Sequence, residues 1–255
     1  MRRIKASNLN RGLVGAWCPS VAGNGLLLPD LSPYGNHGTL QNMDASDWVG
    51  VNRGMALDFD ITDDLINCGP GVLTFINGGS VFSVSAWVLR RSTGGDGFGR
   101  LFEFGNTNSN VILNSLSNNV NLNATGGAVT VSVNSTVATN VMTHYALSVS
   151  VGVSANVYVN STNVTASANL SSGTINIAAS DLILGNRLNA QRSLDGRIAD
   201  FRVYNRALSP SEIKQLYEGG PGYGLRLERK RTRFQVQGFN AGRYRRQQLI
   251  GAGVY

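Results

Sequence analysis

The chain has 255 residues, of which 42% are apolar and only 15% are charged, and its formal net charge is +7. This is the composition of a globular protein, and the length allows one large all-β domain or two small ones to bury a core without metal or disulfide staples. No stretch approaches 18 consecutive apolar residues, which excludes an ordinary membrane-spanning helix, and no membrane insertion is expected.

The positive charge is concentrated at the two ends of the chain. Residues 1–12 hold four basic residues and no acid, and residues 222–255 hold eight basic residues and one acid, whereas residues 13–221 have a net charge of −4. An anionic partner would therefore be bound by the ends. Residues 1–20 lack the apolar run of a secretory signal peptide, so we expect Cys18 and Cys68 to be reduced, partly buried thiols.

Apolar and polar residues alternate with a period of two from residue 13 to about residue 200. The clearest runs are 81–89, 129–133, 144–151, 157–159, 181–184 and 198–204. In the first run, Phe82, Val84, Ala86 and Val88 share one face and Trp87 lies on the other. Runs of this length, separated by turns rich in glycine, asparagine and serine, predict an all-β fold, an antiparallel β-sandwich or jelly roll.

One segment has the pattern of a helix. Ser209 is a predicted N-cap, Pro210 occupies the first turn, and Glu212 stands three residues after the cap. An apolar stripe follows, and the glycines and proline at 219–221 end the helix. The chain therefore divides into a basic N-terminal arm (1–11), a sandwich with one short C-terminal helix (12–221) and a basic, partly apolar C-terminal extension (222–255).

Six motifs follow one another along the sandwich. They are GLVGAW at 12–17, DLSPYGNHGTL at 30–40, ALDF at 56–59 with DDLINCG at 63–69, FSVSAWV at 82–88, THYAL at 143–147 with VYVN at 157–160, and DGRIADFRVYNRALS at 195–209 with Glu212 and Ile213. Together they resemble the laminin-G-like jelly-roll domains, which have the concanavalin A-like lectin and glucanase fold. The resemblance covers about residues 12–218 and does not extend to the C-terminal tail.

Related sandwiches include glycosidases whose strands carry paired acids. Glycoside hydrolysis needs two carboxylates about 5–10 Å apart across a cleft. The chain has four glutamates, and none is spaced with another acid on a strand face. Asp58 and Asp60 share a face, but they belong to a framework strand of the family, so no enzymatic activity is expected. His37 and His144 are expected to serve turn hydrogen bonding and core packing.

The resemblance also implies a calcium ion at one edge of the sandwich. The matching positions are Asp30, Asn36 and Asp200, with backbone carbonyls around Gly35 and His37 as further candidates. Calcium takes about 6–8 oxygen ligands in flexible geometry, which suits carboxylates and turn carbonyls. The alternative is that Asp30 caps its own turn and Asp200 pairs with an arginine, and the sequence favours neither reading.

Carbohydrate binding is a common use of this family. A sugar site needs an exposed aromatic ring close to amides and acids. Tyr34, Trp48 and Phe98 lie in predicted loops and are the candidates, with simple turn packing as the alternative for each. Trp17 and Trp87 are expected in the core.

The C-terminal extension is too apolar for an ordinary solvated charge run. Its candidate docking residues are Arg226, Arg229, Lys230, Arg231, Arg233, Phe234, Phe239, Arg243, Tyr244, Arg245 and Arg246. These side chains suit nucleic acid phosphates and bases, an acidic protein surface, or a merely solubilising end. Docking on protein fits the apolar residues best.

These features suggest a virion protein, made in the host cytoplasm without an export signal. The hypothesis is a non-enzymatic bacteriophage capsid decoration or tail-associated protein. Its termini would hold it to neighbouring virion proteins or to other copies, and its sandwich would face surface glycans. Two alternatives stay open: a carbohydrate-binding module of a cellular protein, and a nucleic-acid-binding protein that uses the basic tail.

Overall fold

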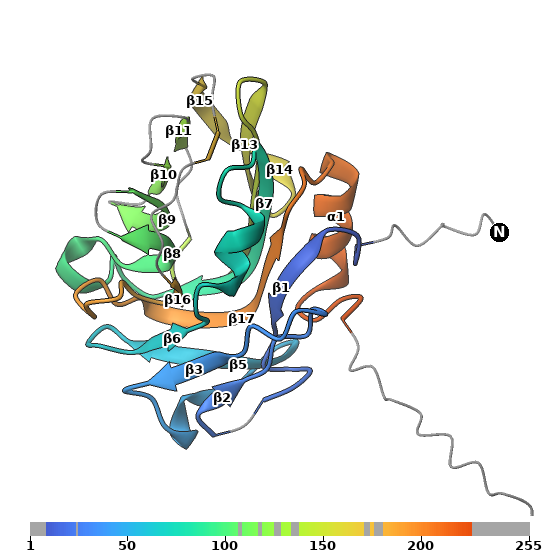
Figure 1. Ribbon diagram of the computed structural model, residues 1–255. Helices are drawn as coiled ribbons and strands as arrows, with labels where there is room; N and C mark the ends of the chain where they lie inside the picture. Colours follow the sequence, from blue (N-terminus) through green and yellow to red (C-terminus); the bar gives the residue numbers. More distant parts are fainter. Residues whose placement is uncertain are drawn as a thin grey trace, which may run out of the picture.

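The computed structural model describes residues 9–23, 25–106, 109–116, 119–124, 129–133, 138–170, 174–175 and 181–225. These residues form two antiparallel sheets, packed as a sandwich, and one α-helix (Figure 1). The predicted all-β class and the jelly-roll sandwich are confirmed.

One sheet, which we call the helix-side sheet, carries the helix on its outer face. Its strands are β1 (Leu13–Trp17), β4 (Trp48–Val51), β5 (Gly54–Asp60), β7 (Val81–Arg90), β12 (Met142–Ser150), β13 (Ser154–Val159), β14 (Thr162–Asn163) and β17 (Asp195–Tyr204). They are ordered β14-β13-β12-β7-β17-β5-β4, and β1 also pairs with β17. The chain-distant strands β7 and β17 are thus neighbours at the centre of the sheet.

The second sheet is ordered β15-β11-β10-β9-β8-β16-β6-β3-β2. Its strands are β2 (Leu27–Leu28), β3 (Gly38–Gln41), β6 (Leu65–Asn67), β8 (Arg100–Asn106), β9 (Ser109–Leu116), β10 (Asn119–Ala124), β11 (Val129–Val133), β15 (Thr165–Leu170) and β16 (Leu182–Leu184). Three short 3-10 turns, η1 (Ala45–Asp47), η2 (Gly71–Phe75) and η3 (Gly95–Gly97), lie in the connections. Every run that the alternation predicted is present as a strand.

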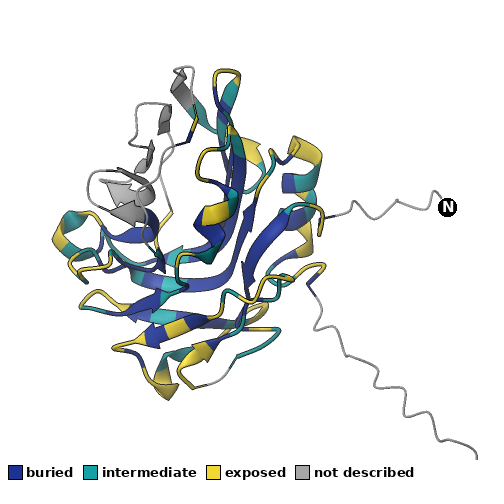
Figure 2. Ribbon diagram, in the orientation of Figure 1, coloured by how far each residue is buried: buried dark blue, intermediate teal, exposed yellow. Residues whose placement is uncertain are grey.

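The core lies between the two sheets, as the alternation in β7 predicted. Phe82, Val84, Ala86 and Val88 belong to the main apolar cluster, and Trp87 belongs to a small cluster on the other face. Strand β17 is buried along most of its length, on both faces (Figure 2).

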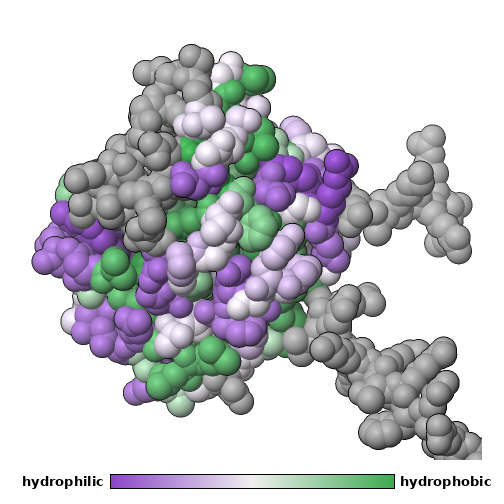
Figure 3. Space-filling model, in the orientation of Figure 1, coloured by the Kyte–Doolittle hydropathy of each residue, from purple (hydrophilic) through white to green (hydrophobic). Residues whose placement is uncertain are grey.

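Elsewhere, apolar surface reaches solvent over the β2 region, at the lower edge of the view in Figure 3, where Leu26 and Leu27 are 58% and 47% exposed.

The outer face of β17 is covered by α1 (Pro210–Gly219) and by residues 220–225. The predicted capping box is present, because the backbone N–H of Glu212 donates to Ser209 Oγ and the backbone N–H of Ser209 donates to Glu212 Oε2. The helix ends at Gly220, whose φ of +78° is a conformation that glycine adopts without strain. Ile213 and Leu216 are the residues that the helix buries.

Both cysteines are free and buried, in agreement with the expected reduced thiols. Burial raises the pKa of the Cys18 thiol to about 12, so this thiol is inert at neutral pH.

Among the described residues, α1 is too short to cross a bilayer, and none of the helices is both long and apolar enough to do so.

Candidate functional site

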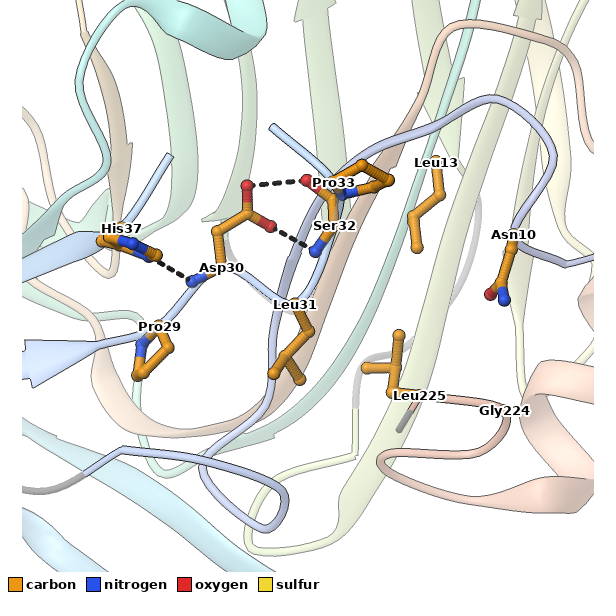
Figure 4. Close-up of a pocket in the computed structure, with 10 residues that line it drawn as sticks. All are labelled: Asn10, Leu13, Pro29, Asp30, Leu31, Ser32, Pro33, His37, Gly224 and Leu225. Atoms are coloured by element: carbon orange, nitrogen blue, oxygen red, sulfur yellow. Dashed lines mark hydrogen bonds between the residues drawn. The ribbon is translucent and has the colours of Figure 1, made fainter. Parts of the chain in front are cut away.

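A pocket of about 920 Å³ lies beside the turn that follows β2, and we call it the opening-turn pocket. It is lined by Asn10, Leu13, Pro29, Asp30, Leu31, Ser32, Pro33, His37, Gly224 and Leu225 (Figure 4). The lining therefore combines the predicted Asp30 turn with the points at which both ends of the chain meet the sandwich.

The carboxylate of Asp30 organises this turn. Its Oδ1 accepts hydrogen bonds from the backbone N–H groups of Ala16 (2.8 Å) and Ser32 (2.9 Å). Its Oδ2 accepts from Ser32 Oγ (2.7 Å) and from the backbone N–H of Asn36 (2.9 Å). The backbone N–H of Asp30 donates to His37 Nδ1 at 3.0 Å (Figure 4), which is the turn role expected of His37.

Asp200 lies on the outer face of β17 and forms a buried ion pair with Arg202. Arg202 Nη2 is 2.6 Å and Nε 3.0 Å from the two carboxylate oxygens, and the side chains are only 2% and 3% exposed. Burial opposes the charge on Arg202, but the Asp200 carboxylate and its hydrogen bonds offset burial and raise the pKa of Arg202. Arg202 is therefore charged inside the protein.

This pair also holds the end of the described chain. The backbone N–H of Gly222 donates to Asp200 Oδ2 at 2.7 Å, and Arg202 Nη1 donates to the backbone carbonyl of Tyr223 at 2.8 Å. Leu225 is 7% exposed and packs in an apolar cluster with residues of β1 and α1. Residues 222–225, which the sequence assigned to the tail, are thus packed on the sandwich.

The two predicted acidic calcium ligands, Asp30 and Asp200, are already engaged by protein donors. Asp30 and Asn36 meet in one turn, whereas Asp200 is paired with Arg202. The arrangement is the one named above as the alternative, in which Asp30 caps its turn and Asp200 pairs with an arginine. The carboxylate oxygens of Asp30 and Asp200 do not suit a calcium ion while they hold these hydrogen bonds. Calcium binding by these residues stays a prediction. Titration of the chelator-treated protein with Ca²⁺ tests it, because binding would raise the melting temperature.

A separate acidic group lies in the turn after β5. Carboxylate oxygens of Asp60, Asp63 and Asp64 lie within 4.8 Å of one another. Burial raises the pKa of the Asp64 carboxyl to about 7. Near neutral pH Asp64 is therefore about half protonated, which relieves the repulsion within the group without a cation.

The three candidate sugar-binding aromatics have different surroundings. Tyr34 is 51% exposed, and its ring lies 4.4 Å from that of Phe75. Phe98 is 39% exposed, with the Arg192 guanidinium 4.7 Å above its ring. Trp48 is half-buried against the core, and its indole N–H donates to the carbonyl of Gly25. Trp48 therefore has the turn-packing role named as its alternative, whereas the side chains of Tyr34 and Phe98 are partly exposed to solvent.

A second concavity, of about 500 Å³, lies on the outer face of the helix-side sheet, and we call it the Trp87 groove. It is lined by Val51, Asn52, Arg53, Trp87, Val141, Met142, Asn160, Tyr217, Glu218 and Pro221. The Trp87 ring stacks on that of Tyr217, with centroids 5.8 Å apart and planes inclined by 16°. Trp87 is buried, as expected, with 8% of its surface exposed, and it belongs to the small apolar cluster on the outer face of the sheet.

The signal for the groove was present in β7 itself. The alternation that sends Val84, Ala86 and Val88 inward sends Trp87 outward, where a large aromatic side chain needs a cover. Tyr217 of α1 supplies that cover. The groove itself could not be predicted, because the residues that line the groove come from five separate segments of the chain.

The acids on β5 are not arranged for glycoside hydrolysis. Asp58 accepts from Arg91 at 2.6 Å and from Arg197 at 2.9 Å, which ties both oxygens to guanidinium groups. Asp60 is exposed and accepts from the backbone N–H of Thr62. Neither acid lines the opening-turn pocket or the Trp87 groove.

The predicted docking residues from Arg226 to Arg246 lie outside the described residues. Leu225 is the last residue that the structure describes, so partner docking by the tail stays a prediction.

Solved structures share the fold at low sequence identity. Domain 4 of AbnA, a GH43 extracellular arabinanase from Geobacillus stearothermophilus solved with arabinotriose, matches 80% of this chain and 97% of its own at 19% identity, with a TM-score of 0.63. Trypanosoma rangeli sialidase matches 81% of this chain but only 32% of its own at 16% identity, with a TM-score of 0.58.

A structure of botulinum neurotoxin type C matches 83% of this chain and 52% of its own at 11% identity, with a TM-score of 0.59. Cell entry of that toxin depends on interaction with two ganglioside molecules. A search of curated proteins found no significant match. The Laminin_G_3 family model, described as the concanavalin A-like lectin/glucanases superfamily, matches residues 65–214. Because that match spans more than half of the chain, this protein belongs to the Laminin_G_3 family of concanavalin A-like domains.

Proposed function

We propose that this protein is a non-enzymatic, glycan-binding module of a virion, held to the particle by its basic ends. The observation that carries the proposal is the common exit of the two ends. Leu9 and Leu225 are buried in one apolar cluster, and Asn10 and Leu225 line the same pocket. The described chain therefore begins and ends on the α1 side of the sandwich (Figure 1), and the sequence continues from both points into basic segments.

Charge pairing supports a binding role rather than hydrolysis. Asp58 and Asp195 share Arg91, and Glu212 pairs with Arg206 at 2.7 Å. A catalytic acid must reach the substrate with a carboxyl that can give up a proton. The hydrogen bond from Arg206 lowers the pKa of Glu212, and the carboxylates of Asp58 and Asp195 are occupied by guanidinium groups. Acids bonded in this way stabilise the sandwich and are unsuited to protonate a leaving group.

Glycan binding is supported by what the same fold does elsewhere. The AbnA domain was solved in complex with arabinotriose, and cell entry of botulinum neurotoxin type C depends on interaction with two ganglioside molecules. Fold likeness by itself is an analogy, and two surfaces of this chain add a local reason. Tyr34 presents an exposed ring and follows Pro33, which lines the opening-turn pocket, and the Trp87 groove combines aromatic rings with amides.

The anchoring role is tested by truncation. The cut belongs before Arg226, because residues 222–225 are packed on the sandwich. Removing residues 226–255 should leave the melting temperature unchanged and abolish incorporation into particles, measured as protein per purified virion. A second variant, in which the eight basic residues of the tail become glutamine, keeps the apolar residues and separates charge from apolar docking. Normal incorporation of the truncated chain would contradict the anchoring role.

A carbohydrate-binding module of a cellular protein is the second candidate. It is favoured by the match to nearly the whole of the AbnA domain, at 97% of that chain. The two candidates differ in their use of the tail. If the truncated protein binds its glycan as tightly as the full chain and neither associates with particles, the cellular module is the better description.

A further inference from the structure

The Trp87 groove brings together side chains from five segments around one aromatic stack. Residues 51–53 come from the β4–β5 turn, Trp87 from β7, residues 141–142 from the start of β12, Asn160 from the turn after β13, and the remaining lining from residues 217–221. Its volume of about 500 Å³ lies within the usual range of small-molecule sites, about 300–1,000 Å³.

The stack gives the groove a rigid apolar wall. The rings of Trp87, Tyr217 and His144 form one cluster, in which the Trp87 centroid lies 5.8 Å from that of Tyr217 and 5.2 Å from that of His144, and the other two centroids are 6.2 Å apart. His144 is fully buried, and its Nε2 lies 2.9 Å from Ser85 Oγ, so this ring of the cluster is fixed. Flat aromatic walls of this kind suit the C–H face of a sugar ring, which is apolar while its hydroxyls point sideways.

Polar groups surround that wall. Asn160 Oδ1 accepts from the backbone N–H of His144 at 3.0 Å, which fixes the orientation of the amide and leaves its NH₂ group to donate. Asn52 and Arg53 are exposed at the tip of the β4–β5 turn. Glu218 is exposed at the end of α1, 3.7 Å from Lys214. Hydroxyl groups both donate and accept, so they can bond amides, a guanidinium and a carboxylate alike.

We propose that the Trp87 groove is the glycan site and that it takes a neutral saccharide. The lining carries one cation, Arg53, and one anion, Glu218, so the groove has no net charge that would select an acidic sugar. Packing of α1 alone would account for the Trp87–Tyr217 stack, but it would not require an open space lined by four other segments, two of which contribute the polar side chains of Asn52, Arg53 and Asn160. This proposal rests on the proposed glycan-binding function and names its site and ligand class.

The test uses the full chain on an array of neutral and acidic saccharides, followed by titration with the saccharides that are bound. Tyr217→Ala removes one ring of the stack, and Val141→Trp fills the groove from a position that is 52% exposed. Each variant should weaken binding about tenfold or more, with an unchanged fold by circular dichroism. Val153→Trp, at a 76% exposed site beyond the other end of β12, is the matched control and should bind normally.

The outcomes separate the site from the function. If Tyr34→Ala abolishes glycan binding while both groove variants bind normally, the groove is the wrong site and the glycan-binding function stands. If the full chain binds only sialylated or uronate-containing saccharides, the neutral class is wrong. If it binds no saccharide on the array, both the groove assignment and the glycan-binding function fail.

Discussion

The two faces of β17 are both buried, but they are buried by different chemistry. Phe201 and Val203 point into the apolar core between the sheets. Asp200 and Arg202 point outward and are covered by residues 220–225. Apolar contacts tolerate many arrangements of similar volume, whereas a buried ion pair is stable only when every donor and acceptor finds its partner. The inner face therefore stabilises the sandwich, and the outer face specifies where the C-terminal segment lies.

The largest expected effect is on the inner face. Phe201→Ala removes a fully buried ring that contacts Trp17 and Phe102, and it should lower the free energy of unfolding by about 4 kcal/mol. Urea unfolding at pH 7 measures the loss. Because the outer face is untouched, chymotrypsin under native conditions should cut no faster after Tyr223, within residues 220–225. Rapid cleavage there would show that the two faces are not independent.

On the outer face, Arg202→Leu should lower the free energy of unfolding by about 3 kcal/mol, because it leaves the Asp200 carboxylate buried without a cation. It should also free residues 220–225, since the bond to the Tyr223 carbonyl is lost. Limited proteolysis under native conditions measures the release. The double variant Asp200→Asn, Arg202→Leu removes the uncompensated charge and should be more stable than the single variant. Equal stability of the two would mean that the ion pair is unimportant.

His144 makes the outer face sensitive to acid. Burial, with a smaller contribution from Arg202, lowers the pKa of His144 to about 3 from its ordinary value of 6.5. The unfolded chain therefore binds this proton first, so its contribution to stability is complete above pH 6.5 and is lost as the pH falls toward 3. Between pH 6.5 and 5 the loss should reach roughly 2 kcal/mol, from about 1.4 kcal/mol per pH unit.

Urea unfolding of the wild type and of His144→Gln at several pH values measures this loss. The difference between the two proteins isolates His144, because Asp64, whose pKa is raised to about 7, is common to both. Parallel pH profiles for the two proteins would exclude His144 as the cause.

The smallest effect concerns the helix that covers the outer face. Ser209→Ala removes the N-cap hydrogen bond to Glu212 and should cost about 1 kcal/mol. Lys214→Ala, at an exposed site of the same helix, should change stability by less than about 0.5 kcal/mol. Thermal unfolding of both variants measures the difference, and an equal change would argue against the capping box as the start of the helix.

The sequence by itself determined the features that depend on neighbours along the chain. The alternation in 81–89 predicted which side chains of β7 face the core, and the spacing of Ser209 and Glu212 predicted the start of α1. Asp30 and His37 were expected in a turn, and they bond each other there. These features are readable because the residues that cause them lie within a few positions of one another.

Only the tertiary structure decided which distant segments meet. The sequence offered Asp200 to calcium or to an arginine, and the fold placed it against Arg202 and the backbone of Gly222. The Trp87 groove needs residues 51–53, 141–142 and 217–221 to converge on one strand. Such contacts leave no periodic trace in any one segment, because the packing of α1 and residues 220–225 onto the sheet brings together residues that are far apart in the sequence.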